Sequence, residues 1–163
     1  MLSFSEDRLV EQLVRHEGIR LSVYQDILGI DTIGVGRNIE DRGFSEFELD
    51  TLNKTIEEIY EVGITKEDAY FLLKIDINIM ANELFKVRPI TKLVDSIRQL
   101  VLMDMAFNMG VPRLCNFVKM WAALEQYDYD SAAKEMLDSK WAKQVKTRAI
   151  RLAYSMKHGV YVH

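Results

Sequence analysis

The segment Arg15–Arg37, RHEGIRLSVYQDILGIDTIGVGR, restricts the possible folds more than any other part of the chain. Apolar residues at helical spacing precede it, and Gly18 is the expected end of that helix. Two short stretches that alternate apolar and polar residues follow, at Arg20–Tyr24 and Thr32–Val35. Such alternation is typical of half-buried strands, and the glycine and acidic residues of Asp26–Asp31 predict a turn between them. The sequence therefore predicts a helix that ends directly before a small β-hairpin.

Acidic residues in this segment occupy contrasting positions. Glu17 would lie in the last helical turn, where unpaired carbonyl groups carry partial negative charge and disfavour an ionised carboxylate. Partial burial would add to this effect and suit Glu17 to proton donation. Asp26 lies in the turn, where water and backbone N–H groups would keep it ionised, and Thr32 supplies a hydroxyl group nearby. Two carboxyl groups in such different environments are the pattern expected for the acid and base of glycoside hydrolysis.

The arrangement resembles the phage-type lysozymes, glycoside hydrolase family 24. The motifs that carry the resemblance are His16-Glu17-Gly18-Ile19-Arg20-Leu21, Tyr24-Gln25-Asp26 and Thr32-Ile33-Gly34-Val35-Gly36. The similarity continues at Met105–Gly110 and at Ser139–Arg148, so it covers nearly the whole chain. It implies an α+β, mostly α, two-lobed lysozyme-like fold, in which a long helix joins a small β-hairpin lobe to a larger helical lobe and the cleft lies between them.

We expect a single lysozyme domain over residues 1–163. Its small lobe would span about residues 14–65, its joining helix about 66–85, and its helical lobe about 86–163 together with the N-terminal helix. Thr65 followed by Lys66-Glu67-Asp68 predicts the start of the joining helix, and Pro89 its end. Other helices are predicted at 48–62, 94–109, 117–124 and 131–137, with 38–47 irregular. Met156–His163 is expected to be a helix end and a loosely held tail.

Composition supports a globular protein and narrows its partners. A chain of 163 residues with 48% hydrophobic residues can bury a core, and no segment approaches the ~20 apolar residues of a membrane span. The first residues, MLSFSEDRLVEQ, contain acids too early for a secretory signal, and no linker to a separate wall-binding domain is evident. The net charge of −4 counts against nucleic acid as a partner. We expect a monomer without membrane insertion.

Cysteine and histidine residues give no indication of a metal or a cofactor. Cys115 is the only cysteine, which excludes an internal disulfide and a cysteine metal cluster. His158 and His163 have no ligand spacing with His16. We therefore expect no cofactor and no metal.

Charge is distributed unevenly along the chain. Residues 1–61 contain fourteen acidic and six basic residues, whereas residues 139–163 contain six basic residues and no acidic one. The basic segment has two interpretations, a solvated helix face or a partner for the acidic catalytic segment. Arg148 belongs to this segment, and the resemblance implies that it contacts Glu17 across the cleft.

The resemblance also implies roles for individual residues. Glu17 would be the general acid, and Asp26 with Thr32 would position a water molecule. The substrate-binding positions that it implies are Asn38, Phe107, Asn108, Met120, Glu135 and Arg148.

For most of these substrate positions an alternative stays open. Phe107 has the alternative of a core residue, and Asn108 that of a helix cap or crosslink. Met120 and Glu135 stand where relatives carry a small hydroxyl residue and an asparagine, which counts against direct contact with sugar. Trp141, in the last motif, is expected in the core.

One position departs from the family pattern. Relatives pair an aspartate of the long helix, here Asp76, with a histidine just after the Thr-Ile-Gly-x-Gly strand, where this chain has Arg37. An arginine would keep its charge where a histidine would titrate. The alternative is an ordinary surface ion pair, worth at most ~1 kcal/mol.

The function that the resemblance implies is hydrolysis of the β-1,4 bond between N-acetylmuramic acid and N-acetylglucosamine of bacterial cell-wall peptidoglycan. We expect an inverting reaction in phage-mediated lysis, by an enzyme that stays in the host cytoplasm until the membrane is permeabilised and then acts on the cell wall. Two alternatives remain, a lytic transglycosylase, which needs only one catalytic acid, and a non-catalytic peptidoglycan-binding module.

Overall fold

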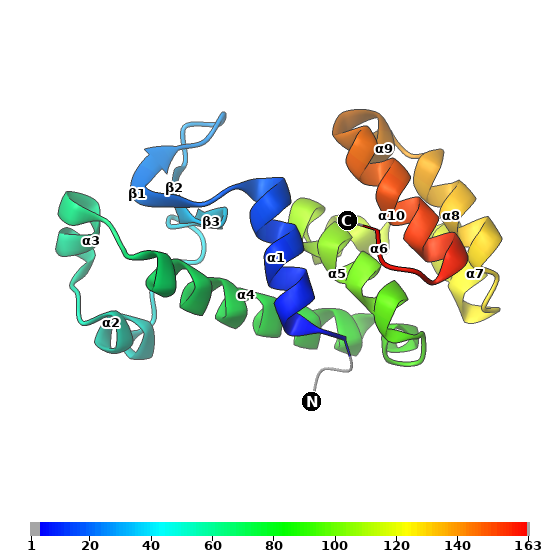
Figure 1. The fold of residues 1–163 in the computed structure, drawn as a ribbon, viewed down its shortest axis with the longest axis horizontal. Helices are drawn as coiled ribbons and strands as arrows, with labels where there is room; N and C mark the ends of the chain where they lie inside the picture. Colours follow the sequence, from blue (N-terminus) through cyan, green and yellow to red (C-terminus); the bar gives the residue numbers. More distant parts are fainter. Residues whose placement is uncertain (1–3, 163) are drawn as a thin grey trace. The chain divides into compact units, whose positions relative to one another are not determined.

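The computed structural model describes residues 4–162 (Figure 1). The predicted α+β, mostly helical fold is confirmed, with a single three-stranded antiparallel sheet in the described part of the chain. The structure divides into two compact units, one formed by Val10–Asp76 and the other by the described residues before Val10 and after Asp76. Met1–Ser3 and His163, the ends of the predicted N-terminal segment and tail, lie outside the described residues.

The helix and hairpin predicted around Gly18 are present. Helix α1, Glu6–Glu17, ends where Gly18 adopts a φ of +76°, and the Gly18 N–H donates to the Val14 carbonyl oxygen over 2.9 Å. The strands are β1, Arg20–Gln25, β2, Asp31–Gly34, and β3, Arg37–Asn38, in the order β1-β2-β3. The third strand was not predicted, because two residues are too short to show alternation.

The helix predicted over residues 48–62 is two helices. They are α2, Glu46–Leu52, and α3, Ile56–Val62. Asn53 ends α2 in the left-handed conformation, with φ of 54°, and the Thr55 hydroxyl caps α3 by accepting from the Glu58 N–H. The prediction was wrong because the apolar spacing continues across the break, while the local hydrogen bonds of Asn53 and Thr55 favour a turn.

The long joining helix is α4, Lys66–Val87. Its predicted cap is confirmed, because the Asp68 N–H donates to the Thr65 hydroxyl over 3.1 Å and the Thr65 N–H donates to the Asp68 carboxylate over 2.9 Å. The chain passes from one compact unit to the other within α4, between Asp76 and Ile77.

Helices follow one another, with short connections, from α4 to residue 158. They are η1, a 3-10 helix at Pro89–Lys92, α5, Ser96–Met109, α6, Val111–Cys115, α7, Val118–Glu125, α8, Tyr129–Leu137, α9, Lys140–Val145, and α10, Thr147–His158. Helix α5 begins two residues later than predicted because the Asp95 carboxylate caps it, accepting from the Arg98 N–H.

Each unit has an apolar core. In the unit that carries the sheet, the buried cluster consists of Ile33, Ile39, Leu52, Ile59, Ile64, Ala69 and Leu72. In the other unit, α5 is buried without interruption from Gln99 to Ala106, and Trp141 is 1% exposed, as predicted. No helix among the described residues is long and apolar enough to cross a membrane.

Candidate active site

One row of side chains crosses all three strands of the sheet. Tyr24 of β1 pairs with Thr32 of β2, and Thr32 pairs in turn with Asn38 of β3. Residues directly opposite each other in antiparallel strands project from the same face, with Cβ atoms about 4.5–5.5 Å apart. Two predicted site residues, Thr32 and Asn38, are therefore neighbours, and Tyr24 belongs to the same row.

A tight turn holds the Asp26 side chain. Its Oδ1 atom accepts hydrogen bonds from the N–H groups of Leu28, over 2.8 Å, and Ile30, over 3.0 Å. Gly29 has a φ of +79° in this turn, a conformation that glycine adopts without strain. Within residues 4–162 no group donates a hydrogen bond to the other oxygen, Oδ2. The turn thus fixes the carboxylate and leaves one oxygen to accept from a ligand or water.

Thr32 is coupled to the same turn. Its side chain is buried, and the hydroxyl group donates to the Ile30 carbonyl oxygen over 2.9 Å. Ile30 therefore receives a hydrogen bond from Thr32 and gives one to Asp26. With its proton committed to Ile30, the Thr32 oxygen is oriented to accept a further hydrogen bond.

Glu17 lies partly buried at the last position of α1, in the same compact unit as Asp26 and Thr32. The electrostatic effect of both carboxylates converges on Tyr24. Burial raises the pKa of Tyr24, the charge of Arg20 lowers it, and the charges of Glu17 and Asp26 raise it, with a net increase. The Tyr24 phenol therefore lies within the electrostatic range of both predicted catalytic carboxylates.

Arg37 is buried and Asp76 is partly buried, so the interpretation of their contact as an ordinary surface ion pair was wrong. Arg37 is 4% exposed and donates to Asp76 through Nε, over 3.1 Å, and Nη2, over 2.8 Å. Nη2 also donates to Glu48 over 2.7 Å, and Nη1 donates to the Gly43 carbonyl oxygen over 3.1 Å. Arg42 contacts both carboxylates as well. Arg37 thus crosslinks β3, α2 and α4.

This cluster shifts the ionisation of its two acids in opposite directions. Burial opposes ionisation of Glu48, but hydrogen bonds from Arg37 and from the Ser45 N–H outweigh it and bring the pKa of Glu48 below its ordinary value. For Asp76, burial is the larger effect, and its pKa is raised despite the charge and hydrogen bonds of Arg37.

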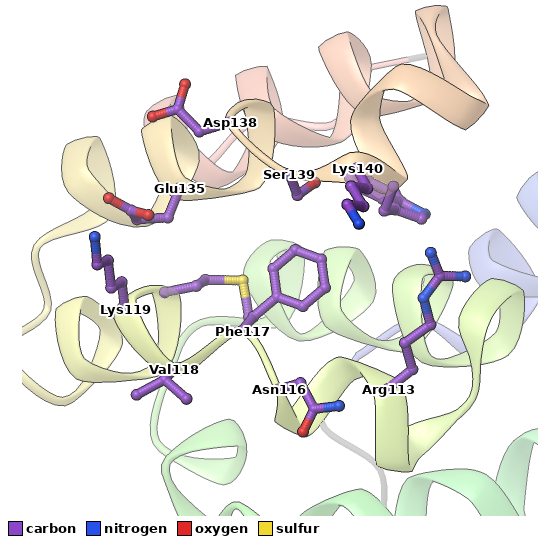
Figure 2. Close-up of a pocket in the computed structure, with 11 residues that line it drawn as sticks. Arg113, Asn116, Phe117, Val118, Lys119, Glu135, Asp138, Ser139 and Lys140 are labelled. Carbon is purple, nitrogen blue, oxygen red and sulfur yellow. The ribbon is translucent and has the colours of Figure 1, made fainter.

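Two predicted substrate positions, Met120 and Glu135, line a hollow in the helical unit (Figure 2). The hollow has a volume of about 550 Å³, and its lining is Arg113, Asn116, Phe117, Val118, Lys119, Met120, Glu135, Asp138, Ser139, Lys140 and Trp141. Met120 is fully buried, whereas Glu135 is half-buried. The role of Met120 as a substrate position stays a prediction.

Asn108 and Phe107 lie at the end of α5 and do not line this hollow. The Asn108 side-chain oxygen accepts a hydrogen bond from the indole nitrogen of Trp141 over 2.7 Å, which links α5 to α9. The alternative in which Asn108 crosslinks helices therefore describes its contact, while sugar binding stays a prediction. Phe107 is half-buried.

Arg148 of α10 forms an ion pair with a residue that sequence reasoning missed. Its Nε atom donates to the Asp104 carboxylate over 2.9 Å, and Asp104 is fully buried in α5. A lone acid within the apolar run Leu100–Ala106 was the available signal, because a buried charge requires a partner. The predicted contact of Arg148 with Glu17 stays a prediction. The other five basic residues after position 138 are exposed.

Comparison with known proteins supports the resemblance. The sequence profile of the phage lysozyme family matches residues 14–153. The chain is 35% identical over 156 residues to the pre-baseplate central spike protein Gp5 of Enterobacteria phage T4, a match that covers 88% of this chain and 26% of that protein. It therefore spans about a quarter of the length of the spike protein.

Two other relatives come from Dictyostelium discoideum. Probable T4-type lysozyme 1 is 26% identical over 165 residues, covering 91% of this chain and 93% of the relative. Probable T4-type lysozyme 2 is 26% identical over 153 residues, covering 88% and 90%. Because the family profile spans most of the sequence and includes Glu17, Asp26 and Thr32, the chain belongs to the phage lysozyme family.

Proposed function

We propose that this chain is a muramidase that hydrolyses the β-1,4 bond between N-acetylmuramic acid and N-acetylglucosamine in bacterial peptidoglycan. Membership of the phage lysozyme family supports a lysozyme-type hydrolase that acts on peptidoglycan. The observation that carries the finer proposal is the shared turn of Asp26 and Thr32, which orients two hydrogen-bond acceptors from one hairpin.

In the proposed reaction, Glu17 donates its proton to the glycosidic oxygen as the bond between that oxygen and the anomeric carbon breaks. A water molecule donates one hydrogen bond to Asp26 Oδ2 and one to the Thr32 oxygen, and its own oxygen attacks the anomeric carbon. Asp26 takes up the proton that the water loses. The negative Asp26 carboxylate also stabilises the positive charge that develops on the sugar ring.

We propose that the configuration at the anomeric carbon inverts. Asp26 acts through water in this scheme, which requires the two carboxyl groups to be about 6.5–9.5 Å apart, whereas a covalent intermediate requires about 5–5.5 Å. Two features of the turn support the water scheme. The two N–H groups bound to Oδ1 restrain Asp26, and the Thr32 oxygen supplies a second acceptor suited to water.

The substrate contacts remain proposals for individual residues. Asn38 is the best supported, because the sheet places it next to Thr32 in one row. Glu135 lines the hollow of Figure 2 and presents a half-buried carboxylate there. We also retain Phe107, Asn108, Met120 and Arg148 as residues of the substrate-binding surface, with Met120 acting through the packing of its neighbours rather than by direct contact.

The biological setting that we propose is lysis of a bacterial host by a phage, with the enzyme held in the host cytoplasm until the membrane is permeabilised. The spike protein among the relatives supports a competing setting, in which the chain is carried by the virion. Mass spectrometry of purified virions and of infected-cell fractions separates the two. Recovery of the chain in virions at stoichiometric amounts would contradict the cytoplasmic setting.

Product analysis tests the proposed reaction. The chain is incubated with purified sacculi, and the soluble fragments are analysed for reducing ends, mass and anomeric configuration. We expect reducing N-acetylmuramic acid ends, released first as the α-anomer because the β bond inverts. Anhydro products would identify a lytic transglycosylase, and binding without release of reducing ends would identify a non-catalytic module. A β-anomer formed first would contradict inversion while leaving hydrolysis intact.

A further inference from the structure

Tyr24 is a polar side chain of the candidate site to which neither the comparisons nor the mechanism above assigns a role. It follows the alternation of β1 two residues before Asp26, and it stands opposite Thr32 in the row that crosses the sheet. Its position is thus set by the same hairpin that holds the proposed base and the proposed water-binding hydroxyl group.

The ring of Tyr24 is held in place by Arg20. The guanidinium carbon of Arg20 lies 4.5 Å from the centre of the ring, and the ring is half-buried. A cation over the face of an aromatic ring is attracted by the negative charge of that face. Because the contact uses the ring face, it restrains the ring and leaves the phenol oxygen at its edge available for another partner.

The phenol hydroxyl group has no hydrogen-bond partner among residues 4–162. The contrast is Tyr60 of α3, in the same compact unit, which is more exposed but donates its hydroxyl proton to the Asp31 carboxylate over 2.8 Å. The hydroxyl group of a buried tyrosine usually finds a partner within the protein, whereas that of the half-buried Tyr24 is left to water or a ligand. Tyr24 instead presents its donor in the neighbourhood of Glu17 and Asp26 without bonding to either.

The electrostatic setting keeps this group a donor. Burial, Glu17 and Asp26 all raise the pKa of Tyr24, and they outweigh the opposing charge of Arg20. The phenol therefore stays protonated at any pH at which a carboxylic acid and a carboxylate can share the catalytic work. A neutral donor beside two carboxyl groups can bind an acceptor oxygen of the substrate without adding charge to the site.

We propose that the Tyr24 hydroxyl group donates a hydrogen bond to an acceptor oxygen of the sugar ring at the bond being cleaved, and that Arg20 is the positioning residue that holds the phenol for this contact. Tyr24 is then a further catalytic residue. This role for Tyr24 rests on the muramidase function proposed above. The acceptor is the oxygen of a hydroxyl group on this sugar ring and not the endocyclic oxygen, which shares the developing positive charge. Hydrogen bonds to ring hydroxyl groups strengthen as the ring flattens toward the oxocarbenium-like transition state.

The test compares Tyr24→Phe with Tyr60→Phe on purified sacculi. Tyr24→Phe removes the hydroxyl group and keeps the ring against Arg20, so it should fold with an unchanged melting temperature. We expect kcat to fall about tenfold, the loss of one neutral hydrogen bond in the transition state, with KM changed less than about twofold. Tyr60→Phe, the matched control, loses a hydroxyl contact outside the row and should keep the wild-type kcat.

The pH profile separates a contact with the substrate from an effect through the carboxyl groups. Because Tyr24 is neutral throughout, the midpoints of the kcat/KM profile should stay where they are in the wild type. Displaced midpoints would show that Tyr24 acts through Glu17 or Asp26, which overturns the substrate contact.

Arg20→Met provides a second variant that keeps the hydroxyl group and removes the cation. It should lower kcat by less than Tyr24→Phe does, because the phenol remains but is less restrained. If Tyr24→Phe does not fold, a wild-type kcat in Arg20→Met overturns the proposal. If the wild type is active and the Tyr24→Phe variant is equally active, the role of Tyr24 is overturned and the muramidase function stands. A wild-type chain that releases no reducing ends overturns the muramidase function together with it.

Discussion

The guanidinium group of Arg37 lies buried between two carboxylates, and the sequence indicated only part of this arrangement. The contact with Asp76 was predictable from the family pattern, in which an aspartate of the long helix has a basic partner. The contact with Glu48 was not, because the capping-box spacing of Ser45 and Glu48 indicates only the hydrogen bonds between these two residues and gives no sign of a contact with Arg37. Glu48 is only 1% exposed, and this burial follows from the fold and not from the local sequence.

The cluster makes stability depend on pH in a direction that follows from Glu48. Its pKa is lower in the folded chain than in the unfolded one, so it stabilises the fold above the unfolded-state value, and that stability is lost as the pH falls through the folded-state value. Asp76 acts in the opposite sense, because its raised pKa means that ionisation costs folding free energy as the pH rises. The two effects partly offset each other.

Replacing Glu48 isolates its contribution to the pH dependence of stability. Glu48→Gln should lower the free energy of unfolding by about 3 kcal/mol near pH 7, because Arg37 loses a buried partner and the new amide N–H₂ group faces a donor. The deficit should shrink on acidification through the folded-state pKa of Glu48, since the wild type then loses the same charge. Urea denaturation of both proteins at a series of pH values measures this deficit.

Glu46 provides the matched control, because it is an exposed acid in the same helix. Glu46→Gln should change the free energy of unfolding by no more than about 0.5 kcal/mol at any of these pH values. A deficit in Glu48→Gln that stays constant from neutral to acidic pH would show that the charge of Glu48 is not the source of its effect.

Asn108 offers a second prediction for a single residue. Asn108→Ala should lower the free energy of unfolding by about 1–3 kcal/mol, because it leaves the indole N–H of the buried Trp141 without its acceptor. Thermal unfolding measures this, and Asn116→Ala, an exposed asparagine of the same unit, is the control. An unchanged melting temperature with a raised KM would instead assign Asn108 to sugar binding alone.

Among the elements, those whose ends carry a strong local signal were predicted best. The cap at Thr65, the stop at Gly18 and the hairpin around Asp26 all agree with the structure. The break between α2 and α3 was missed, because it depends on a left-handed Asn53 that apolar spacing does not reveal. Helix α5 begins at Ser96 and not at residue 94, because the Asp95 carboxylate caps it, and apolar spacing does not mark this cap.

The junction of α3 and β1 depends on one glycine. Gly63 has a φ of +77°, and a Cβ atom there would lie 2.2 Å from the Leu21 carbonyl oxygen, which also accepts from the Ile64 N–H. Gly63→Ala should therefore lower the free energy of unfolding by about 2–3 kcal/mol through strain and steric overlap. Chemical denaturation measures the change.

A substitution at Gly43 separates backbone strain from steric overlap as causes of the expected loss. Gly43 also has a positive φ, +59°, but a Cβ atom there would approach nothing closer than 3.8 Å. Gly43→Ala should thus show the backbone cost alone and destabilise the chain less than Gly63→Ala. Equal losses in the two variants would mean that the close approach to Leu21 contributes nothing.

At the scale of the whole molecule, the three proposed catalytic residues belong to one of the two compact units. Glu17, Asp26 and Thr32 all lie in Val10–Asp76, and hydrogen bonds within the hairpin orient the last two. The resemblance predicted these residues, but the route by which Ile30 couples Asp26 to Thr32 depends on hairpin geometry that a sequence does not show. The same holds for the row that adds Tyr24 and Asn38.

The central claim is that Glu17 is the proton donor of a peptidoglycan hydrolase, and the rate of reducing-end release from purified sacculi tests it most directly. Glu17→Gln is nearly isosteric and cannot donate the proton, so we expect the melting temperature to be retained while the rate falls at least about 100-fold. A correctly folded Glu17→Gln variant that releases reducing ends at close to the wild-type rate would contradict the account.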